Sequence, residues 1–443
     1  MPAVGGTLGS GGASGGAAAG AVGWVPLRIA PGRVRLWAVG LFLIGLAPIV
    51  AAPFFGFHDW PVFWSAGSVV GSGNLVDGNR LIAWETSRGL SVGVFPYLPA
   101  SAFVLWPLAQ LPLAAGFWIW AVAMLASAAL AARIAARVFD LPVWVAVGAA
   151  LAWAPLTGAI VIGQNTPLAL LLAMVAIEGL VAGESVGVSA GEGAEAREPA
   201  RNAAAARAPG ESVGALARSA TERASGPMAV GSRGWIAAGL GSGLLLYKPT
   251  LGLPLVALLV LRRRDRALAL VAVTLVAWYA VGVLASGGDL GWPRVWLDTI
   301  TGYVADDAAR NADKAISLVG LIARLPVAPI VPLVAGALVV LGALPRLIRA
   351  RIREAAAGAC LIGLAVSPHA YGYEAALAMP FIWWVLGGGI AEPWRTRLIV
   401  ASYALVPLWL LSAETRISAV AIIVLGWVVV WIGGMWRGDR VEE

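Results

Sequence analysis

The sequence predicts an all-α fold, a polytopic bundle of about twelve transmembrane helices. Hydrophobic residues make up 60% of the 443-residue chain and charged residues only 12%, whereas a water-soluble domain carries about 25% charged residues. The mean hydropathy is +0.83. Apolar stretches of about 20 residues, the length that crosses about 30 Å of hydrocarbon, recur along the chain. Most of the surface is therefore expected to face the lipid bilayer.

Hydrophilic segments divide the chain. Residues 1–30, rich in Gly, Ala and Ser, are predicted to be a disordered cytoplasmic N-terminus rather than a cleaved signal peptide. Residues 183–233 contain no aromatic residue and no apolar periodicity, so we expect a disordered cytoplasmic insert. The insert separates a first membrane module, 31–182, from a second, 234–437. Residues 438–443 are expected to be a cytoplasmic tail.

Ten apolar stretches are assigned as spans, and three shorter pieces need interpretation. The two pieces on either side of Lys248-Pro249-Thr250 are each too short to cross comfortably, and they fit either one kinked helix or a hairpin of two short helices. The segment 98–111 is short and flanked by prolines, so we interpret it as a juxtamembrane or re-entrant helix in a long outer loop, 53–112. The ten spans are expected at about 35–52, 113–132, 142–160, 166–182, 267–285, 327–345, 356–368, 375–390, 398–412 and 417–435.

The distribution of basic residues predicts the orientation. If the N-terminus lies inside and Lys248 is the apex of a hairpin, 23 of the 31 basic residues fall in cytoplasmic segments, as the positive-inside rule requires. Counting 98–111 as a full span would break this bias. We therefore expect a plasma (inner) membrane protein with both termini in the cytoplasm. The net charge of +7 follows from this topology, and we expect no nucleic-acid partner.

Polar segments on the outer face are the candidates for chemistry, because ionisable groups near the membrane are costly and tend to be functional. Four such segments are expected in this topology, and they include both histidines of the chain. They are the loop with His58-Asp59-Trp60, the turn Gly163-Gln164-Asn165, the loop 286–325, and Ser367-Pro368-His369-Ala370-Tyr371-Gly372-Tyr373-Glu374.

Asp59 directly follows the first span and has aromatic neighbours in sequence. A carboxylate there is suited to act as a general base on a sugar hydroxyl, an effect of about 10²–10⁴-fold. The alternative is a capping role, since Asp followed by Trp60-Pro61 fits the start of an interfacial helix. The residues alone leave both interpretations open.

The other candidate side chains also have two interpretations each. Lys248 is the one lysine embedded in an apolar stretch; it suits an anionic head group or phosphate, or it snorkels to the interface. Gln164 and Asn165 are suited to bind a sugar or to cap their turn. His369 and Glu374 fit either a shared site or separate interfacial positions.

Several features indicate no chemistry. The single cysteine, Cys360, excludes an intramolecular disulfide and a Cys-rich metal site, and we expect a packed core thiol. Asp306-Asp307 are interpreted as a solvated face, and no His or Cys cluster has metal-ligand spacing. No Gly-rich piece matches a phosphate-cradling loop. We therefore expect neither a metal nor a cofactor.

Five segments occur in one order along the chain. They are HDWPVFWSAG, FPYLPASAFVLWPLAQLPL, GQNTPLALLLA, GLGSGLLLYKPTLGLPLVALLVLRRR and SPHAYGYE. This order resembles glycosyltransferase family 87 of the GT-C superfamily, which includes polyprenyl-phosphate-mannose-dependent α-mannosyltransferases of phosphatidylinositol mannoside and lipomannan synthesis. The family has an aspartate after the first span, a Tyr-Pro-Pro-Leu segment, a Gly-Gln-x-Asn helix start, a Lys-Pro pair with a basic end, and a late Ser-Pro segment. The resemblance covers most of the chain outside 1–30 and 183–233.

The resemblance implies a GT-C type fold whose long first outer loop carries juxtamembrane helices. It implies an inverting transfer, on the outer face, of a sugar from a polyprenyl phosphate donor to a glycolipid or glycan acceptor in lipoglycan biosynthesis, with mannose the expected sugar. Asp59 would be the general base, and Lys248, with His369 second, would stabilise the leaving phosphate. The other matched positions expected to bind donor or acceptor are His58, Trp60, Tyr97, Gln164, Asn165, Tyr373 and Glu374.

Departures from the family pattern leave the sugar and the acceptor open. The chain reads Tyr97-Leu98-Pro99 for Tyr-Pro-Pro, Lys314-Ala315-Ile316-Ser317-Leu318 for Asn-Gln-Ser-Leu, and has one late histidine. Transfer of arabinofuranose from a similar carrier is one alternative. A transporter or flippase is another, supported by the interrupted helix at Lys248 but not by any internal repeat. A non-catalytic scaffold would leave the outer polar clusters without a role.

Overall fold

The computed structural model describes residues 59–90, 93–184, 233–311, 314–390, 394–405 and 418–434, with side chains omitted for 304–310. Within these ranges every regular element is a helix, and extended backbone pairs only in an isolated antiparallel bridge between Ala315 and Tyr371. The predicted first span, His58, most of the insert 183–233 and the tail 438–443 lie outside the described residues.

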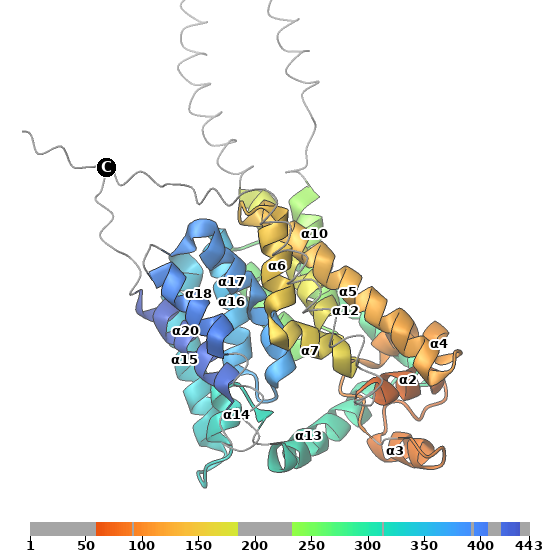
Figure 1. The fold of residues 1–443 in the computed structure, drawn as a ribbon. Coiled ribbons are helices and arrows are strands. Elements are labelled where there is room, and N and C mark those ends of the chain that lie inside the picture. Colours follow the sequence, from red (N-terminus) through yellow and green to blue (C-terminus); the bar gives the residue numbers. More distant parts are fainter. Residues whose placement is uncertain are drawn as a thin grey trace, which may run out of the picture.

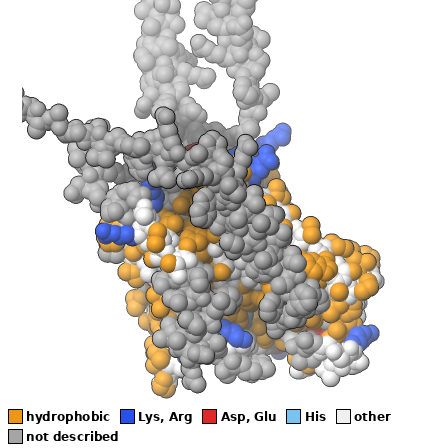
Figure 2. Space-filling view, in the orientation of Figure 1, with side chains coloured by type: hydrophobic (Ala, Val, Ile, Leu, Met, Phe, Trp, Pro, Cys, Tyr) orange, Lys and Arg blue, Asp and Glu red, His pale blue; other side chains and the backbone are white. Residues whose placement is uncertain are grey.

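Four helices in the described residues are long and apolar enough to cross a membrane. Only 22% of the apolar window of each of the last two is buried, and side chains such as Val276 and Leu338 are more than 60% exposed. Figure 2 shows this apolar surface in orange. Such a surface is suited to lipid, so the protein is embedded in a membrane. The four helices are α5 Leu113–Val138, the helix Thr166–Glu184, α12 Asp265–Ala285 and α15 Ile330–Arg349.

The predicted span 142–160 is broken into two helices rather than continuous. α6 Val143–Ala152 and α7 Ala154–Ile162 meet at an angle of 64°. Pro155 has no N–H to continue the helical ladder, and the backbone of Trp153 is extended at the break. The indole of Trp153 donates to the Ala375 carbonyl at 2.9 Å, so a distant contact holds the bend. Counting the bent pair as one span gives five, and the predicted total of about twelve stays a prediction.

The Lys248 region is a hairpin rather than one kinked helix. α10 Gly234–Leu245 and α11 Pro249–Leu261 are separated by a three-residue turn. A Cβ on Gly234 would lie 3.0 Å from Gly183 N, and Arg264, just after α11, donates to the Gly183 carbonyl at 3.3 Å. The start of α10 and the end of α11 therefore lie at the same end of the bundle. The turn with Lys248 is the apex, and Pro249 favours the break because it cannot donate to Leu245.

α16 Ile352–Val366 and the segment that follows it are largely buried in the bundle. The buried side chains of α16 include Cys360. A Cβ on Gly358 would lie 2.2 Å from the Trp431 ring, so only glycine permits this approach. The predicted span 375–390 is instead a series of short helical pieces. The elements after α16 are η4 Gly372–Ala378, α17 Met379–Trp384, η5 Val385–Gly389, α18 Trp394–Leu405 and α20 Ala419–Gly433.

Short helices gather at the end of the bundle where the hairpin has its apex (Figure 1). The segment 98–111 is the short pair η1 Pro99–Ser101 and α4 Ala102–Ala109, which suits the juxtamembrane interpretation. The region 286–325, predicted as a loop, contains the 19-residue helix α13. The sequence interpretation favoured a loop because the segment carries many charged residues and too few apolar ones for a span. The other helices at this end are α2 Trp60–Ser68, α3 Gly78–Thr86, α13 Trp292–Arg310 and α14 Leu318–Ile322.

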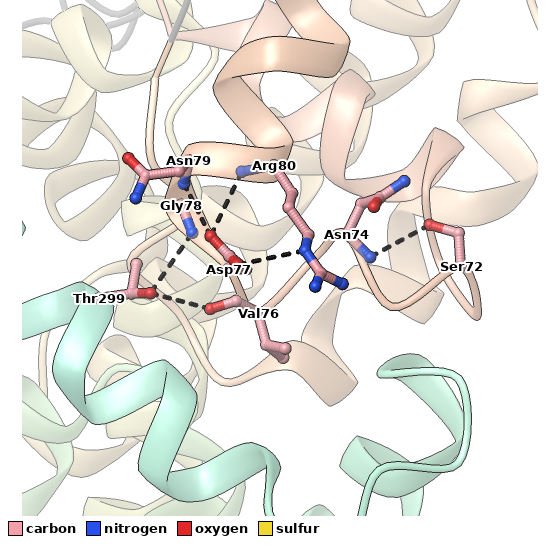
Figure 3. Close-up of polar contacts among 8 residues, drawn as sticks. All are labelled: Ser72, Asn74, Val76, Asp77, Gly78, Asn79, Arg80 and Thr299. Atoms are coloured by element: carbon pink, nitrogen blue, oxygen red, sulfur yellow. Dashed lines mark hydrogen bonds and ion pairs between the residues drawn. The ribbon is translucent and has the colours of Figure 1, made fainter.

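α13 is docked on the start of α3 through Thr299 (Figure 3). The Thr299 hydroxyl donates to the Val76 carbonyl at 3.0 Å and accepts from Gly78 N at 3.3 Å. The Asp77 carboxylate caps α3 by accepting from the backbone N–H groups of Asn79 and Arg80. These contacts fix the segment around α3 to α13, although the two are far apart in the sequence.

Basic side chains gather at the opposite end. Arg137 pairs with Glu178 at 2.6 Å, and Arg353 pairs with Asp140. Arg262 donates to the carbonyl of Ala350. In the part of the chain that the structure describes, the segments around Arg137, Arg262 and Arg353, all predicted to be cytoplasmic, therefore share one end. Which end faces the cytoplasm stays a prediction.

Candidate functional site

Asp59 is placed by the tight contact between the start of α2 and the end of α7. Its backbone N–H donates to the Ile162 carbonyl at 3.0 Å. Gly163 ends α7 in the left-handed conformation, with φ +85°, and a Cβ there would lie 2.7 Å from Trp60 Cβ. Glycine is therefore needed at this turn both for its backbone angle and for the close approach.

The Asp59 carboxylate does not cap α2, although the residue occupies the N-cap position. Oδ2 instead accepts a hydrogen bond from Gln164 Nε2 at 2.6 Å. The side chain is partly exposed, so a substrate hydroxyl has access to it. The hydrogen bond from an α2 backbone N–H to the Asp59 carboxylate, on which the capping interpretation depends, is therefore not made.

Tyr97 continues the network from Gln164. Its hydroxyl donates to Gln164 Oε1 at 3.0 Å, and both side chains are 5% exposed. Trp296 of α13 donates to the Tyr97 carbonyl at 2.9 Å. The Tyr97 ring stacks on Phe63 of α2, with ring centroids 5.4 Å apart. Three elements therefore hold the phenol in one position.

Lys248 lies at the apex of the hairpin with its ammonium inside the protein. Nζ is 2.7 Å from Glu374 Oε1, and the two side chains are 8% and 1% exposed. The ammonium also lies 5.3 Å from the ring centroid of Tyr97 and 5.8 Å from that of Tyr373, within cation–π range. Lys248 is therefore directed into the protein and does not snorkel to an interface.

The Lys248 ammonium keeps capacity to bind an anion. It is electrostatically paired with Glu374 at 2.7 Å, but no partner in the described residues meets the angular requirements of a hydrogen bond to Nζ. The short distance establishes the ion pair, since Coulomb attraction does not depend on the N–H directions. An ammonium has three N–H donors, so the pairing with Glu374 does not use the full donor capacity of Lys248.

Glu374 and His369 both belong to the segment after α16. Glu374 Oε2 accepts from the Tyr371 N–H at 3.1 Å, which orients the carboxylate toward Lys248. The His369 ring lies 4.4 Å from the ring of Tyr371 and 5.5 Å from that of Tyr303 on α13. The half-buried histidine thus connects the segment after α16 to α13.

Not every predicted site residue joins this network. Trp60 is fully buried and its indole donates to the Leu113 carbonyl at 2.8 Å, so it supports α2 from behind. Asn165 accepts from the Tyr247 hydroxyl through its backbone carbonyl at 3.2 Å. Its side-chain Oδ1 is buried without a hydrogen-bond partner in the described part of the chain.

Sequence reasoning missed the aromatic residues that connect the site. Tyr247, next to Lys248, accepts from the Leu98 N–H through its carbonyl at 3.2 Å. Tyr303 and Trp296 come from α13, which was expected to be a loop. Their spacing from Trp292 is compatible with one helical face, and this was the signal available in the sequence. Within the described residues no three His, Cys, Asp or Glu side chains form a group that could hold a metal.

The fold and the site together define a membrane-embedded helical protein with a carboxylate and a buried ammonium joined by polar side chains at one end of the bundle. The model of glycosyltransferase family 87 matches residues 95–191 and 220–368. The match covers more than half of the chain, and the chain therefore belongs to this family and is a membrane glycosyltransferase. Tyr97, Gln164 and Lys248 lie inside the matched ranges, and Asp59 and Glu374 lie outside them. The curated proteins and the solved structures gave no match.

Proposed function

We propose that the protein transfers a sugar, with mannose the expected one, from a polyprenyl phosphate carrier to a hydroxyl of a lipid-linked or glycan acceptor on the outer face. The observation that carries the proposal is the chain of contacts from the Asp59 carboxylate through Gln164 and Tyr97 to the Lys248 ammonium. A base and a cation in one network suit a reaction in which a hydroxyl loses a proton and a phosphate leaves.

Asp59 is the proposed general base. It accepts the proton of the acceptor hydroxyl as the acceptor oxygen bonds to the anomeric carbon. The bond from that carbon to the phosphate oxygen breaks in the same displacement, and the electron pair leaves with the lipid phosphate. The configuration is therefore inverted. General base catalysis of this kind contributes about 10²–10⁴-fold to the rate.

Lys248 is the proposed partner of the donor phosphate. Negative charge develops on the phosphate oxygen as the sugar leaves, and a fixed cation in a buried site stabilises that charge. Glu374 neutralises the ammonium while no donor is bound, because an unpaired buried cation is costly. The Lys248 ammonium lies within cation–π range of Tyr373, and His369 contacts the ring of Tyr371, whose N–H donates to Glu374. We assign His369 and Tyr373 to donor or acceptor binding, together with Asn165.

Family membership favours a glycosyltransferase over the transporter and scaffold alternatives, but it does not specify the sugar. The test is transfer of labelled sugar by purified protein in lipid nanodiscs. Polyprenyl phosphate mannose and polyprenyl phosphate arabinofuranose are offered in parallel with an extract of membrane glycolipids as acceptor. Labelled product from the mannose donor alone supports the proposal. Product from the arabinofuranose donor alone contradicts the assignment of the sugar, and no product from either contradicts the donor class.

A further inference from the structure

Gln164 is held at both ends of its amide by protein groups. Its Nε2 donates to Asp59 Oδ2 at 2.6 Å, and its Oε1 accepts from the Tyr97 hydroxyl at 3.0 Å. The side chain is 95% buried, being only 5% exposed. The reverse orientation of the amide would place Oε1 against the carboxylate, acceptor against acceptor, and would lose the first bond. The Asp59 carboxylate therefore sets the orientation of the amide, and the Tyr97 hydroxyl holds the other end by donating to Oε1.

The backbone beneath Gln164 is also fixed. Its N–H donates to the Ala159 carbonyl at 2.8 Å in the turn that ends α7, and the indole of Trp120 donates to the Gly163 carbonyl at 2.9 Å. Asp59 is attached to the same turn through its own N–H and Ile162. The carboxylate and the amide that holds it thus share one rigid support.

We propose that Gln164 is a positioning residue that orients the Asp59 carboxylate and stabilises its charged form, with Tyr97 holding the amide in place. This inference rests on the proposed role of Asp59 as the general base. It assigns Gln164 a function that differs from binding the sugar. A hydrogen-bond donor that holds the carboxylate in its reactive rotamer preorganises the base for proton transfer. A hydrogen bond to the charged form also stabilises the ionised carboxylate.

The two possible roles of Gln164 predict different kinetics. A sugar-binding residue contributes to donor or acceptor affinity, so its loss would raise KM. A residue that acts through Asp59 contributes to the chemical step, so its loss would lower kcat with little change in KM. The pH profile adds a second distinction, since removing the donor from the carboxylate moves the acidic limb of kcat to higher pH. The charged and titratable groups around Asp59 and Gln164 are Tyr97, Tyr247, Lys248, Tyr303, Tyr373 and Glu374.

The experiment compares Gln164→Leu with wild type and with Asp59→Asn in the sugar-transfer assay. We expect Gln164→Leu to lower kcat about 10- to 100-fold, the loss of one hydrogen bond to a charged group, with KM for donor and acceptor within about twofold and the acidic limb shifted upward. Tyr97→Phe keeps the ring beside Lys248 but removes the hydroxyl, so we expect a smaller fall in kcat of the same kind. The matched control is Gln110→Leu, because the exposed Gln110 side chain donates to the Trp106 carbonyl on its own helix, and its loss should leave kcat unchanged.

The outcomes separate this inference from the proposed function. The positioning role is overturned if Gln164→Leu has a normal kcat, or if its entire loss of kcat/KM comes from a higher KM. An inactive Asp59→Asn would in that case still support Asp59 as the general base. An active Asp59→Asn contradicts the proposed function itself. If Gln164→Leu fails to fold, Tyr97→Phe decides: a fall in kcat with the upward shift supports the inference, and a wild-type profile overturns it.

Discussion

Replacing Lys248 by methionine, alone and together with Glu374→Gln, separates two proposed contributions of this residue. One is the stability that comes from its buried ion pair with Glu374, and the other is the stabilisation of the donor phosphate. The substitution keeps the apolar stem and removes the ammonium. Glu374, 1% exposed, then keeps the hydrogen bond from the Tyr371 N–H but loses its cation. Removing one partner of a buried ion pair costs about 3–5 kcal/mol, because the other charge stays buried. We expect Lys248→Met to lower the free energy of unfolding by that order, measured by titration with a denaturing detergent.

The double variant Lys248→Met, Glu374→Gln tests the second contribution. Replacing both charges removes the unpaired carboxylate, so stability should return to within about 1 kcal/mol of wild type. The donor should still be used poorly, by about 10- to 100-fold in kcat/KM, because the cation for the phosphate is missing. The reasoning is refuted if the single variant is as stable as wild type. It is also refuted if the stable double variant uses the donor normally.

Three further predictions follow from other parts of the molecule. Burial raises the pKa of Glu85 on α3 from 4.5 to about 7, so the native state keeps its proton over a range in which the unfolded state has lost it. Stability should therefore fall as pH rises from about 4.5 to about 7, and Glu85→Gln, which can still accept from Gly93 N, should flatten this dependence in unfolding measured at pH 5 and pH 8. Gly163→Ala should lower activity at least about tenfold and cost more than the 1–2 kcal/mol of left-handed strain, because its Cβ meets Trp60. Gly89→Ala, also at positive φ but with nothing within 4 Å, should cost only the strain and leave activity normal. The predicted cytoplasmic insert is tested by Ser212→Cys in intact cells: with Cys360 buried, an impermeant thiol reagent should label nothing, and ready labelling would contradict the topology.

Hydropathy predicted the long helices well because burial in lipid requires only length and apolar composition. α5, α12 and α15 each begin within a few residues of the expected start. The break at Trp153 was missed because a proline inside an apolar stretch can bend a span or be tolerated in it. The contact that holds the bend, from the Trp153 indole to the Ala375 carbonyl, joins segments far apart in the chain, and no local pattern reveals it. α13 was missed because its charges resemble those of a loop.

The candidate site could be predicted residue by residue but not as an arrangement. Asp59, Gln164 and Lys248 were each chosen for residue type and place in the topology. Their contacts depend on tertiary packing between segments far apart in the chain, and sequence reasoning offered no way to pair Lys248 with Glu374. The glycine at Gly163 was read as part of a motif, whereas its physical role is the close approach of two backbones.

The most direct test of the central claim is the transfer rate of Asp59→Asn. Asparagine keeps the size of the side chain and is about as good a helix cap as aspartate, but it cannot accept the proton. The account predicts that kcat falls about 100-fold or more while the protein stays folded and binds the polyprenyl phosphate donor as wild type does. A folded Asp59→Asn protein with near-normal transferase activity would contradict the account and would leave Glu374 as the next carboxylate to test.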